Sequence, residues 1–260
     1  MSNEILAHRE GGILSLTFNR LEKKNAITTV MYTRLAEELE QAAEDDAVRV
    51  AVIQGDVSCF TAGNDLADFL NNPPNMAASA DAEPAPVVRF LNILRVFPKP
   101  IVAAVAGPAV GIGTTLLLHC DLVYAGDNAA FSLPFVNLGL CPEAGSALLL
   151  PSLVGYPRAA EKLMLGEAFY AEEAVEMGIV NRVLPPQEVN SYAQGQAAKL
   201  AAKPMASLRA TKAVMKMGQV GLKAIMDEEL KLFGALLRGP AAKEAISAVM
   251  EKRKPNFQGM

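Results

Sequence analysis

The stretch from residue 100 to residue 120 contains no lysine, arginine, aspartate or glutamate, and it constrains the fold more than any other part of the chain. An apolar run of about 20 residues is long enough to span a bilayer as a helix. Here, however, Gly107-Pro108 interrupts the run and Gly111-Ile112-Gly113 opens a second one. The pattern therefore predicts a buried strand over residues 101–106, a tight turn, and a buried helix that starts at the glycines and covers residues 114–118.

A strand, turn and helix of this kind can have a chemical use. The first N–H groups of the helix have no partner within it and face outward at its positive end. Such groups can hold a phosphate or an oxyanion. A close-packed turn without any chemistry explains the same glycines equally well. The stretch alone leaves both interpretations open.

Composition excludes several classes of protein. With 260 residues, 51% of them hydrophobic, the chain can form one large domain, or one domain with an appendage, with a substantial core. A net charge of −4 gives no reason to expect binding to nucleic acid or to an anionic membrane. Three widely spaced cysteines and two separate histidines predict neither a disulfide scaffold nor a metal site. Because the N-terminus has no secretory pattern, we expect a cytoplasmic protein.

Hydrophobic periodicity divides the chain into an α/β part and a helical part. Strands are predicted at residues 5–9, 13–18, 48–54, 121–125, 129–132 and 179–183, and helices at 29–44, 66–70, 87–96, 146–153, 157–165 and 171–177. Val30, Met31, Leu35 and Leu39 are expected on the apolar side of the first helix. The proline-rich segment 71–86 is predicted to be a mobile surface segment over a site. The order of elements indicates repeated ββα units, and helices are predicted from Pro186 onward.

Two glycine-rich segments are candidates for chemistry, residues 62–65 and 111–113. Each follows a predicted strand and precedes a predicted helix, so two of their N–H groups could converge into an oxyanion hole. Neither segment has the G-x-G-x-x-G pattern of a dinucleotide site or the lysine of a P-loop.

Glu143 is the carboxylate best placed for catalysis, because it follows Pro142 in an otherwise apolar loop. A buried carboxylate there would have a raised pKa and could act as a general base. Acidic residues are also common in the first turn of a helix, and by pattern alone that structural role is favoured. His119 and Cys141 are expected to be core residues rather than a base and a nucleophile.

Several groups of residues resemble motifs of the enoyl-CoA hydratase/isomerase superfamily, the crotonases, with matching spacing along nearly the whole chain. The matching groups are residues 19–26, 60–66, 105–113 with 120–122, 171–181 and 251–257.

The resemblance implies a spiral of ββα units over residues 1–200, which binds acyl-CoA, and a helical region over residues 201–260 for contacts within a trimer or a dimer of trimers. It implies a coenzyme A thioester substrate whose oxygen is held by the backbone N–H groups of Asn64 and Ile112. Residues at the family's substrate-binding positions are Asn25, Ala26, Ala62, Asp65, Leu66, Gly111 and Phe135. Lys24 and Lys252 are expected at the phosphates, with Lys252 coming from a neighbouring subunit.

Departures from the family pattern bear on the reaction. Hydratases of the family use two glutamates, and those positions are Thr115 and Phe135 here. Glu143 stands where the Δ3,Δ2-enoyl-CoA isomerases of the family have their catalytic base. The resemblance therefore favours an isomerase that moves a double bond from position 3 to position 2 of an acyl-CoA, without any cofactor. The alternatives are an enoyl-CoA hydratase of fatty acid β-oxidation and a non-catalytic acyl-CoA-binding protein.

Overall fold

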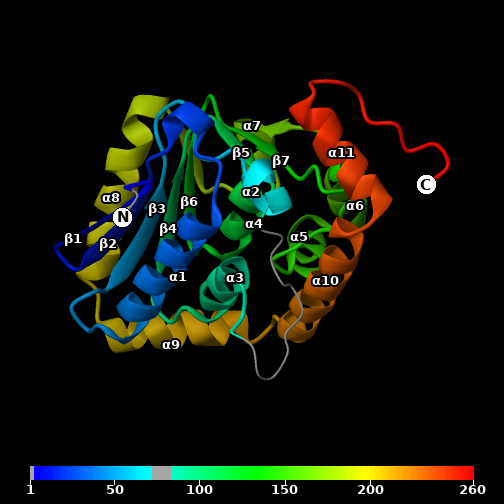
Figure 1. The fold of residues 1–260 in the computed structure, drawn as a ribbon. Coiled ribbons are helices and arrows are strands. Elements are labelled where there is room, and N and C mark those ends of the chain that lie inside the picture. The colour runs from blue at the N-terminus through cyan, green and yellow to red at the C-terminus, as the bar shows by residue number, and fades with distance from the viewer. Residues whose placement is uncertain (1–2, 72–82) are drawn as a thin grey trace.

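The computed structural model describes residues 3–71 and 83–260, and in them two β-sheets are surrounded by helices (Figure 1). The larger sheet has the strand order β1-β2-β3-β4-β6-β9, and the smaller one has the order β5-β7-β8. The strands are β1 Ile5–Glu10, β2 Ile13–Phe18, β3 Val50–Gln54, β4 Ile101–Val105, β5 Pro108–Val110, β6 Leu122–Gly126, β7 Ala130–Ser132, β8 Phe169–Tyr170 and β9 Arg182–Leu184. In the larger sheet, β1 is antiparallel to β2 and the other neighbours are parallel.

Helices fill the connections and form the C-terminal third of the chain. The α-helices are α1 Thr29–Glu44, α2 Leu66–Asn71, α3 Pro86–Val96, α4 Ile112–Thr115, α5 Ser146–Val154, α6 Tyr156–Leu165, α7 Ala171–Glu176, α8 Pro186–Ala201, α9 Met205–Lys216, α10 Leu222–Leu237 and α11 Pro240–Met250. Short 3₁₀ helices are η1 Leu21–Lys23, η2 Leu116–His119 and η3 Val136–Leu138. No helix in these described ranges is long and apolar enough to cross a membrane.

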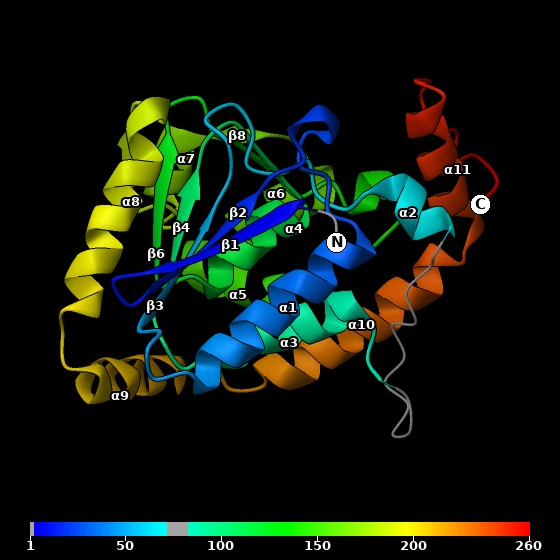
Figure 2. The same ribbon diagram turned by 60° about the vertical axis from the view of Figure 1, so that its left-hand side comes forward.

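The central strands are buried on both faces, and alternate residues belong to two different cores. Val52 and Val102 are paired neighbours that face α8, whereas the next pair, Ile53 and Ala103, faces the opposite side. On α8, every fourth residue packs on the sheet, namely Val189, Ala193, Ala197 and Ala201. Figures 1 and 2 show α8 on one side of the sheet, with α1 and α3 on the other.

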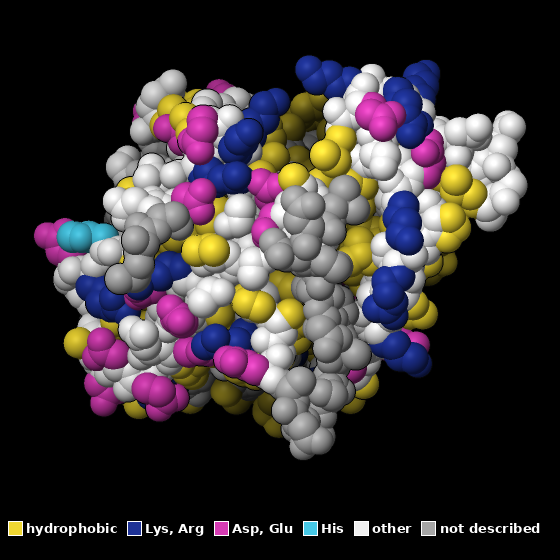
Figure 3. Space-filling model, viewed as in Figure 1, with side chains coloured by type: hydrophobic (Ala, Val, Ile, Leu, Met, Phe, Trp, Pro, Cys, Tyr) yellow, Lys and Arg dark blue, Asp and Glu magenta, His cyan; other side chains and the backbone are white. Residues whose placement is uncertain are grey.

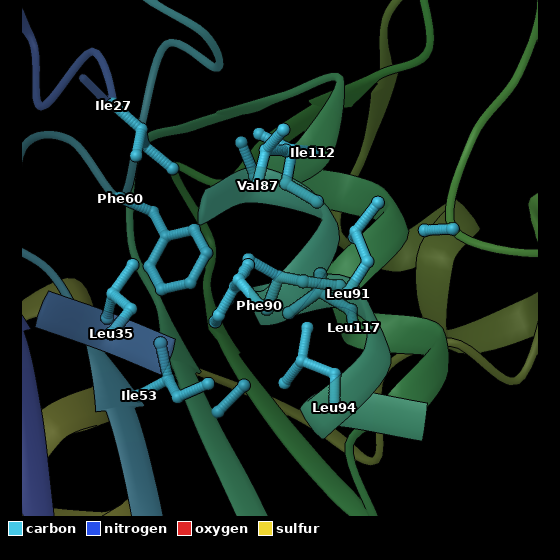
Figure 4. Packing of buried hydrophobic residues seen from close by; sticks show 14 of the residues in the cluster. Ile27, Leu35, Ile53, Phe60, Val87, Phe90, Leu91, Leu94, Ile112 and Leu117 are labelled. Carbon is cyan, nitrogen blue, oxygen red and sulfur yellow. The ribbon is translucent and has the colours of Figure 1, made fainter. Parts of the chain in front are cut away.

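The main core lies between the sheet and α1, α3 and the segment after β4. Figure 4 shows Phe60, Phe90 and Leu117 converging there from three different parts of the chain. On α1, Met31, Leu35 and Leu39 are buried, as expected from their spacing of four residues. The prediction for Val30 is wrong, because its side chain is 59% exposed. One residue of helix turns the side chain by about 100°, which takes Val30 off the buried face.

Most predicted elements are confirmed, with differences at the ends and in the shortest ones. In the uncharged stretch, β4 and a buried helical segment are present, but residues 108–110 form the strand β5 instead of a simple turn. The helical part is a single α-turn continued as 3₁₀ helix through η2. The last strand begins at Arg182, later than predicted. The prediction for residues 71–86 falls mostly on residues 72–82, outside the described residues.

The C-terminal helices stand apart from the larger sheet. In Figure 1, α9 runs along the lower end of the molecule, and α10 and α11 form its right-hand side. Helix α10 packs on α5 and α11 packs on η3. Of these helices, α10 and α11 face the glycine-rich segments 62–65 and 111–113, whereas α9 contacts the residues just before β3 and β4.

Candidate active site

The two glycine-rich segments lie side by side because their strands are joined by backbone hydrogen bonds. The N–H of Thr61 donates to the carbonyl of Pro108 at 3.0 Å, and the N–H of Val110 donates to the carbonyl of Thr61 at 3.0 Å. Asn64 lies in the first segment and Ile112 lies in the second. The pairing therefore brings these two residues to the same place, although 48 positions of sequence separate them (112 − 64).

Both segments present unused backbone donors. Across residues 3–71 and 83–260, neither the N–H of Asn64 nor that of Ile112 donates to another group. Ile112 is the first residue of α4, so its N–H has no partner in the helix. Gly63 has φ +87°, and a Cβ atom there would lie 2.8 Å from the carbonyl oxygen of Val110. Only glycine lets the two segments approach this closely.

A largely apolar cavity of about 780 Å³ opens at these two residues. Of the residues predicted to bind substrate or form the oxyanion hole, those that line it are Ala26, Ala62, Asn64, Asp65, Leu66, Gly111, Ile112 and Phe135. The C-terminal helices close the other side with Phe233, Leu237, Ala245, Ile246 and Val249. Figure 3 shows hydrophobic side chains in a hollow beside α11. The size and lining suit a ligand with a long apolar portion.

The other predicted residues lie outside the cavity lining. Asn25 is fully buried, and its side-chain amide donates to the carbonyls of Cys59 and Phe60 at 2.9 and 3.1 Å. Lys24 is exposed beside Lys23, which does line the cavity. Lys252 is exposed in the turn after α11. Asn25 thus holds the segment that precedes Asn64, a structural contribution to the site.

Glu143 lies behind the cavity wall and is 1% exposed. The hydroxyl of Thr115 donates to its Oε1 at 3.2 Å. No residue in the described ranges donates to its Oε2. The pKa of Glu143 is raised to about 8. Burial is the main cause, the charge of Glu229 acts in the same direction, and the Thr115 hydrogen bond acts against them. A carboxylate in such surroundings is a stronger base than usual.

Two neighbours of the site were missed by sequence analysis. Tyr32, buried on α1, donates its hydroxyl to Oδ1 of Asn64, and burial and then the charge of Glu143 raise the pKa of Tyr32. Glu229, buried on α10, accepts hydrogen bonds from the loop that carries Glu143. Neither belongs to a local motif, and only the packing of distant helices brings them here. The structural interpretation of His119 is confirmed, since its buried ring contacts the carbonyl of Ala144 at 2.7 Å.

Together, the fold and the site define a class of protein: a ββα scaffold that holds two free N–H groups over an apolar cavity, with a buried carboxylate behind them. The family model for enoyl-CoA hydratase/isomerase matches residues 8–260. The chain is therefore a member of the enoyl-CoA hydratase/isomerase family, with the crotonase fold.

Individual relatives include both hydratases and isomerases. The chain is 37% identical to 2,3-dehydroadipyl-CoA hydratase of Escherichia coli strain K12, over 99% of each chain. It is 38% identical to enoyl-CoA delta isomerase 2 of Rattus norvegicus, over 98% of this chain and 65% of the rat protein. The structure of OdaA from Pseudomonas aeruginosa superposes with a TM-score of 0.91 at 47% identity, covering 96% of this chain and 99% of OdaA. The protein is thus an enzyme of this family.

Proposed function

We propose that the protein is an acyl-CoA isomerase that shifts a double bond from position 3 to position 2 of an enoyl-CoA. The observation that carries the proposal is the buried carboxylate of Glu143, held behind the two free N–H groups of Asn64 and Ile112. A 1,3-proton transfer needs one group that accepts a proton and then returns it, together with a site for the negative charge that develops in between.

The proposed reaction has two proton transfers. Ionised Glu143 takes a proton from C2 of the 3-enoyl thioester, and the negative charge moves onto the thioester oxygen. The N–H groups of Asn64 and Ile112 stabilise this dienolate. Glu143 then returns the proton to C4, which leaves the double bond between C2 and C3. The reaction needs no cofactor, since coenzyme A is part of the substrate.

The residues at the two hydratase positions support isomerisation over hydration. Thr115 is fully buried, and its hydroxyl is engaged with Glu143. Phe135 is 4% exposed and presents an apolar ring to the cavity. Neither can deprotonate a water molecule, and the apolar lining helps to keep water from the intermediate.

We further propose that the apolar part of the cavity takes the acyl chain and that Lys24 contacts the phosphates of coenzyme A, with Lys252 reaching them from a neighbouring subunit of a trimer or a dimer of trimers. Exposed apolar side chains at the end of α9 and just beyond it support such contacts. Met215, Met217 and Val220 are 73%, 73% and 84% exposed. We also propose that the enzyme acts in the cytoplasm.

The test is the variant Glu143→Gln assayed with a 3-enoyl-CoA, following formation of the conjugated 2-enoyl product by its ultraviolet absorbance. Turnover is expected to fall by about 10² to 10⁴, the contribution of a general base, while the thermal unfolding of the variant stays cooperative. The control is Glu228→Gln, which makes the same substitution at an exposed position and should keep wild-type turnover. A folded Glu143→Gln enzyme with turnover near that of the wild type would exclude this mechanism.

Hydration remains the second candidate function, favoured by the similarity to the Escherichia coli hydratase over the full chain. Water addition to a 2-enoyl-CoA, measured on the same preparation, separates the two reactions. The proposal requires isomerisation to be the faster one. If an acyl-CoA binds but neither reaction exceeds background, the chain is an acyl-CoA-binding member without chemistry.

A further inference from the structure

The backbone after Glu143 takes an unusual course. Ala144 has φ +59° and Gly145 has φ +72°, so two successive residues are left-handed just before α5 begins at Ser146. Left-handed backbone is costly for alanine and persists only where surrounding groups enforce it. The turn decides where the Glu143 carboxylate points, and its supports therefore matter to the reaction.

Glu229 supports this turn from α10. Its side chain is buried, with Oε2 accepting the N–H of Gly145 at 2.6 Å and Oε1 accepting the N–H of Ala147 at 2.9 Å. Both oxygens act as acceptors, as they do in an ionised carboxylate. Gly145, the N-cap of α5, has no side chain to cap the helix. Glu229 thus caps α5 from a distant helix, 84 positions later in the sequence (229 − 145).

Two further contacts complete the support. The hydroxyl of Ser146 donates to the carbonyl of Glu143 at 2.6 Å. Burial lowers the pKa of His119 to about 4, so its ring is neutral at physiological pH. Its Nε2 lies 2.7 Å from the carbonyl of Ala144 and donates to it. Of these three supports, only Glu229 is a carboxyl, and only Glu229 comes from the C-terminal helices.

We propose that Glu229 is a positioning residue for Glu143. The charged carboxylate of Glu229 holds the left-handed turn, and it places a second, fixed negative charge close to the base. This inference rests on the proposed function, in which Glu143 is the base.

The groups that face Glu143 come from several elements. They are Thr115 on α4, Tyr32 on α1, Cys141 in the same loop and Glu229 on α10, with neutral His119 behind the turn. Among them, Glu229 is the one carboxyl. Burial raises its pKa, and the hydrogen bonds from the N–H groups of Ala147 and Gly145 act in the opposite direction and favour the charged form. The charge of Glu229 acts in the same direction as burial and raises the pKa of Glu143. Removing that charge is therefore expected to lower the pKa of Glu143, while removing the hydrogen bonds loosens the turn.

The experiment compares Glu229→Gln with Glu228→Gln, which changes the charge equally at an exposed neighbouring position of α10. In each, the pKa of Glu143 is measured by carbon NMR of labelled glutamate carboxyls, with its signal assigned by loss in Glu143→Gln. In Glu229→Gln we expect this pKa to fall by about half a unit or more. We expect kcat to fall by about tenfold and KM to change little, because Glu229 does not line the cavity. Glu228→Gln should match the wild type in all three.

A second variant separates the two effects and guards against loss of folding. Glu229→Asp keeps the charge but is one methylene shorter, so it cannot reach both N–H groups. We expect a lower kcat with the pKa of Glu143 near its wild-type value. Glu229 variants with wild-type kcat and an unmoved Glu143 pKa would overturn the proposal. Wild-type protein without isomerase activity, combined with the NMR shift in Glu229→Gln, would instead reject the proposed reaction and leave the structural role of Glu229 intact.

Discussion

The hydroxyl of Thr115 offers a direct test of how the protein adjusts its base. It donates to Oε1 of Glu143 at 3.2 Å in a fully buried position. This hydrogen bond stabilises the ionised carboxylate and so opposes the effect of burial on the pKa. The variant Thr115→Val lacks the hydroxyl but keeps the shape of the side chain, so no cavity forms.

The size of the effect follows from the geometry. At 3.2 Å the contact is longer than most O–H···O hydrogen bonds, so we assign it about 1 kcal/mol, which is below the range of about 1.5 to 3 kcal/mol for hydrogen bonds to charged groups. That free energy corresponds to about 0.7 of a pKa unit. The pKa of Glu143 should therefore rise from about 8 in the wild type to almost 9. Because the base must be ionised to accept a proton, kcat/KM falls as the pH drops below this pKa. At neutral pH the variant should be about fivefold slower.

The assay is the pH profile of kcat/KM for a 3-enoyl-CoA between about pH 6 and about pH 9.5, where the acidic limb reports the ionisation of the free enzyme. The difference between variant and wild type should shrink toward the alkaline end. Thr17→Val is a matched control, because it removes a hydroxyl that contacts Gln54 on the α8 side of the sheet. An acidic limb that stays in place, or moves to lower pH, in Thr115→Val would refute the account of Glu143 given above.

Two further predictions concern the oxyanion hole at Asn64 and the turn at Gly107. Tyr32→Phe removes the hydroxyl that holds the side chain of Asn64 and should lower kcat by about tenfold with KM unchanged; steady-state kinetics with wild-type kcat would contradict this role. Gly107→Ala should cost about 3 kcal/mol or more of the free energy of unfolding in urea titrations, because φ is +66° and the new Cβ would lie 2.0 Å from the carbonyl oxygen of Ser58. A variant as stable as the wild type would show that this turn is free to move.

Much of the fold can be predicted from the sequence wherever a single hydrophobic periodicity dominates a segment. The spacing of Met31, Leu35 and Leu39 places α1 correctly, and the apolar run at residues 101–105 places β4. Strands β5 and β8 were missed, because segments of three and two residues are too short to show a period. They form because β7 of the same chain offers each of them free backbone groups, and that pairing depends on tertiary structure.

The candidate site likewise contains residues that a local pattern predicts and residues that only the fold brings together. Asn64 and Ile112 lie in glycine-rich segments between a strand and a helix, so local pattern predicts free N–H groups there. Glu143 is conspicuous as a lone acid in an apolar loop, but its burial and its partners come from the fold. Glu229 looks from the sequence like one of several acidic residues along α10. Its role comes from the docking of α10 on α5, for which no local pattern exists.

The cap that α10 places on the loop of the base has a consequence for how the protein is made. A ribosome delivers the sheet, the oxyanion segments and Glu143 well before it delivers Glu229, which lies 86 positions after Glu143 in the sequence (229 − 143). N-terminal regions of a growing chain generally fold first. The nascent chain can thus complete its scaffold while the turn after Glu143 still lacks its charged support. The enzyme acquires a correctly aimed base only after α10 has been synthesised and has docked on α5.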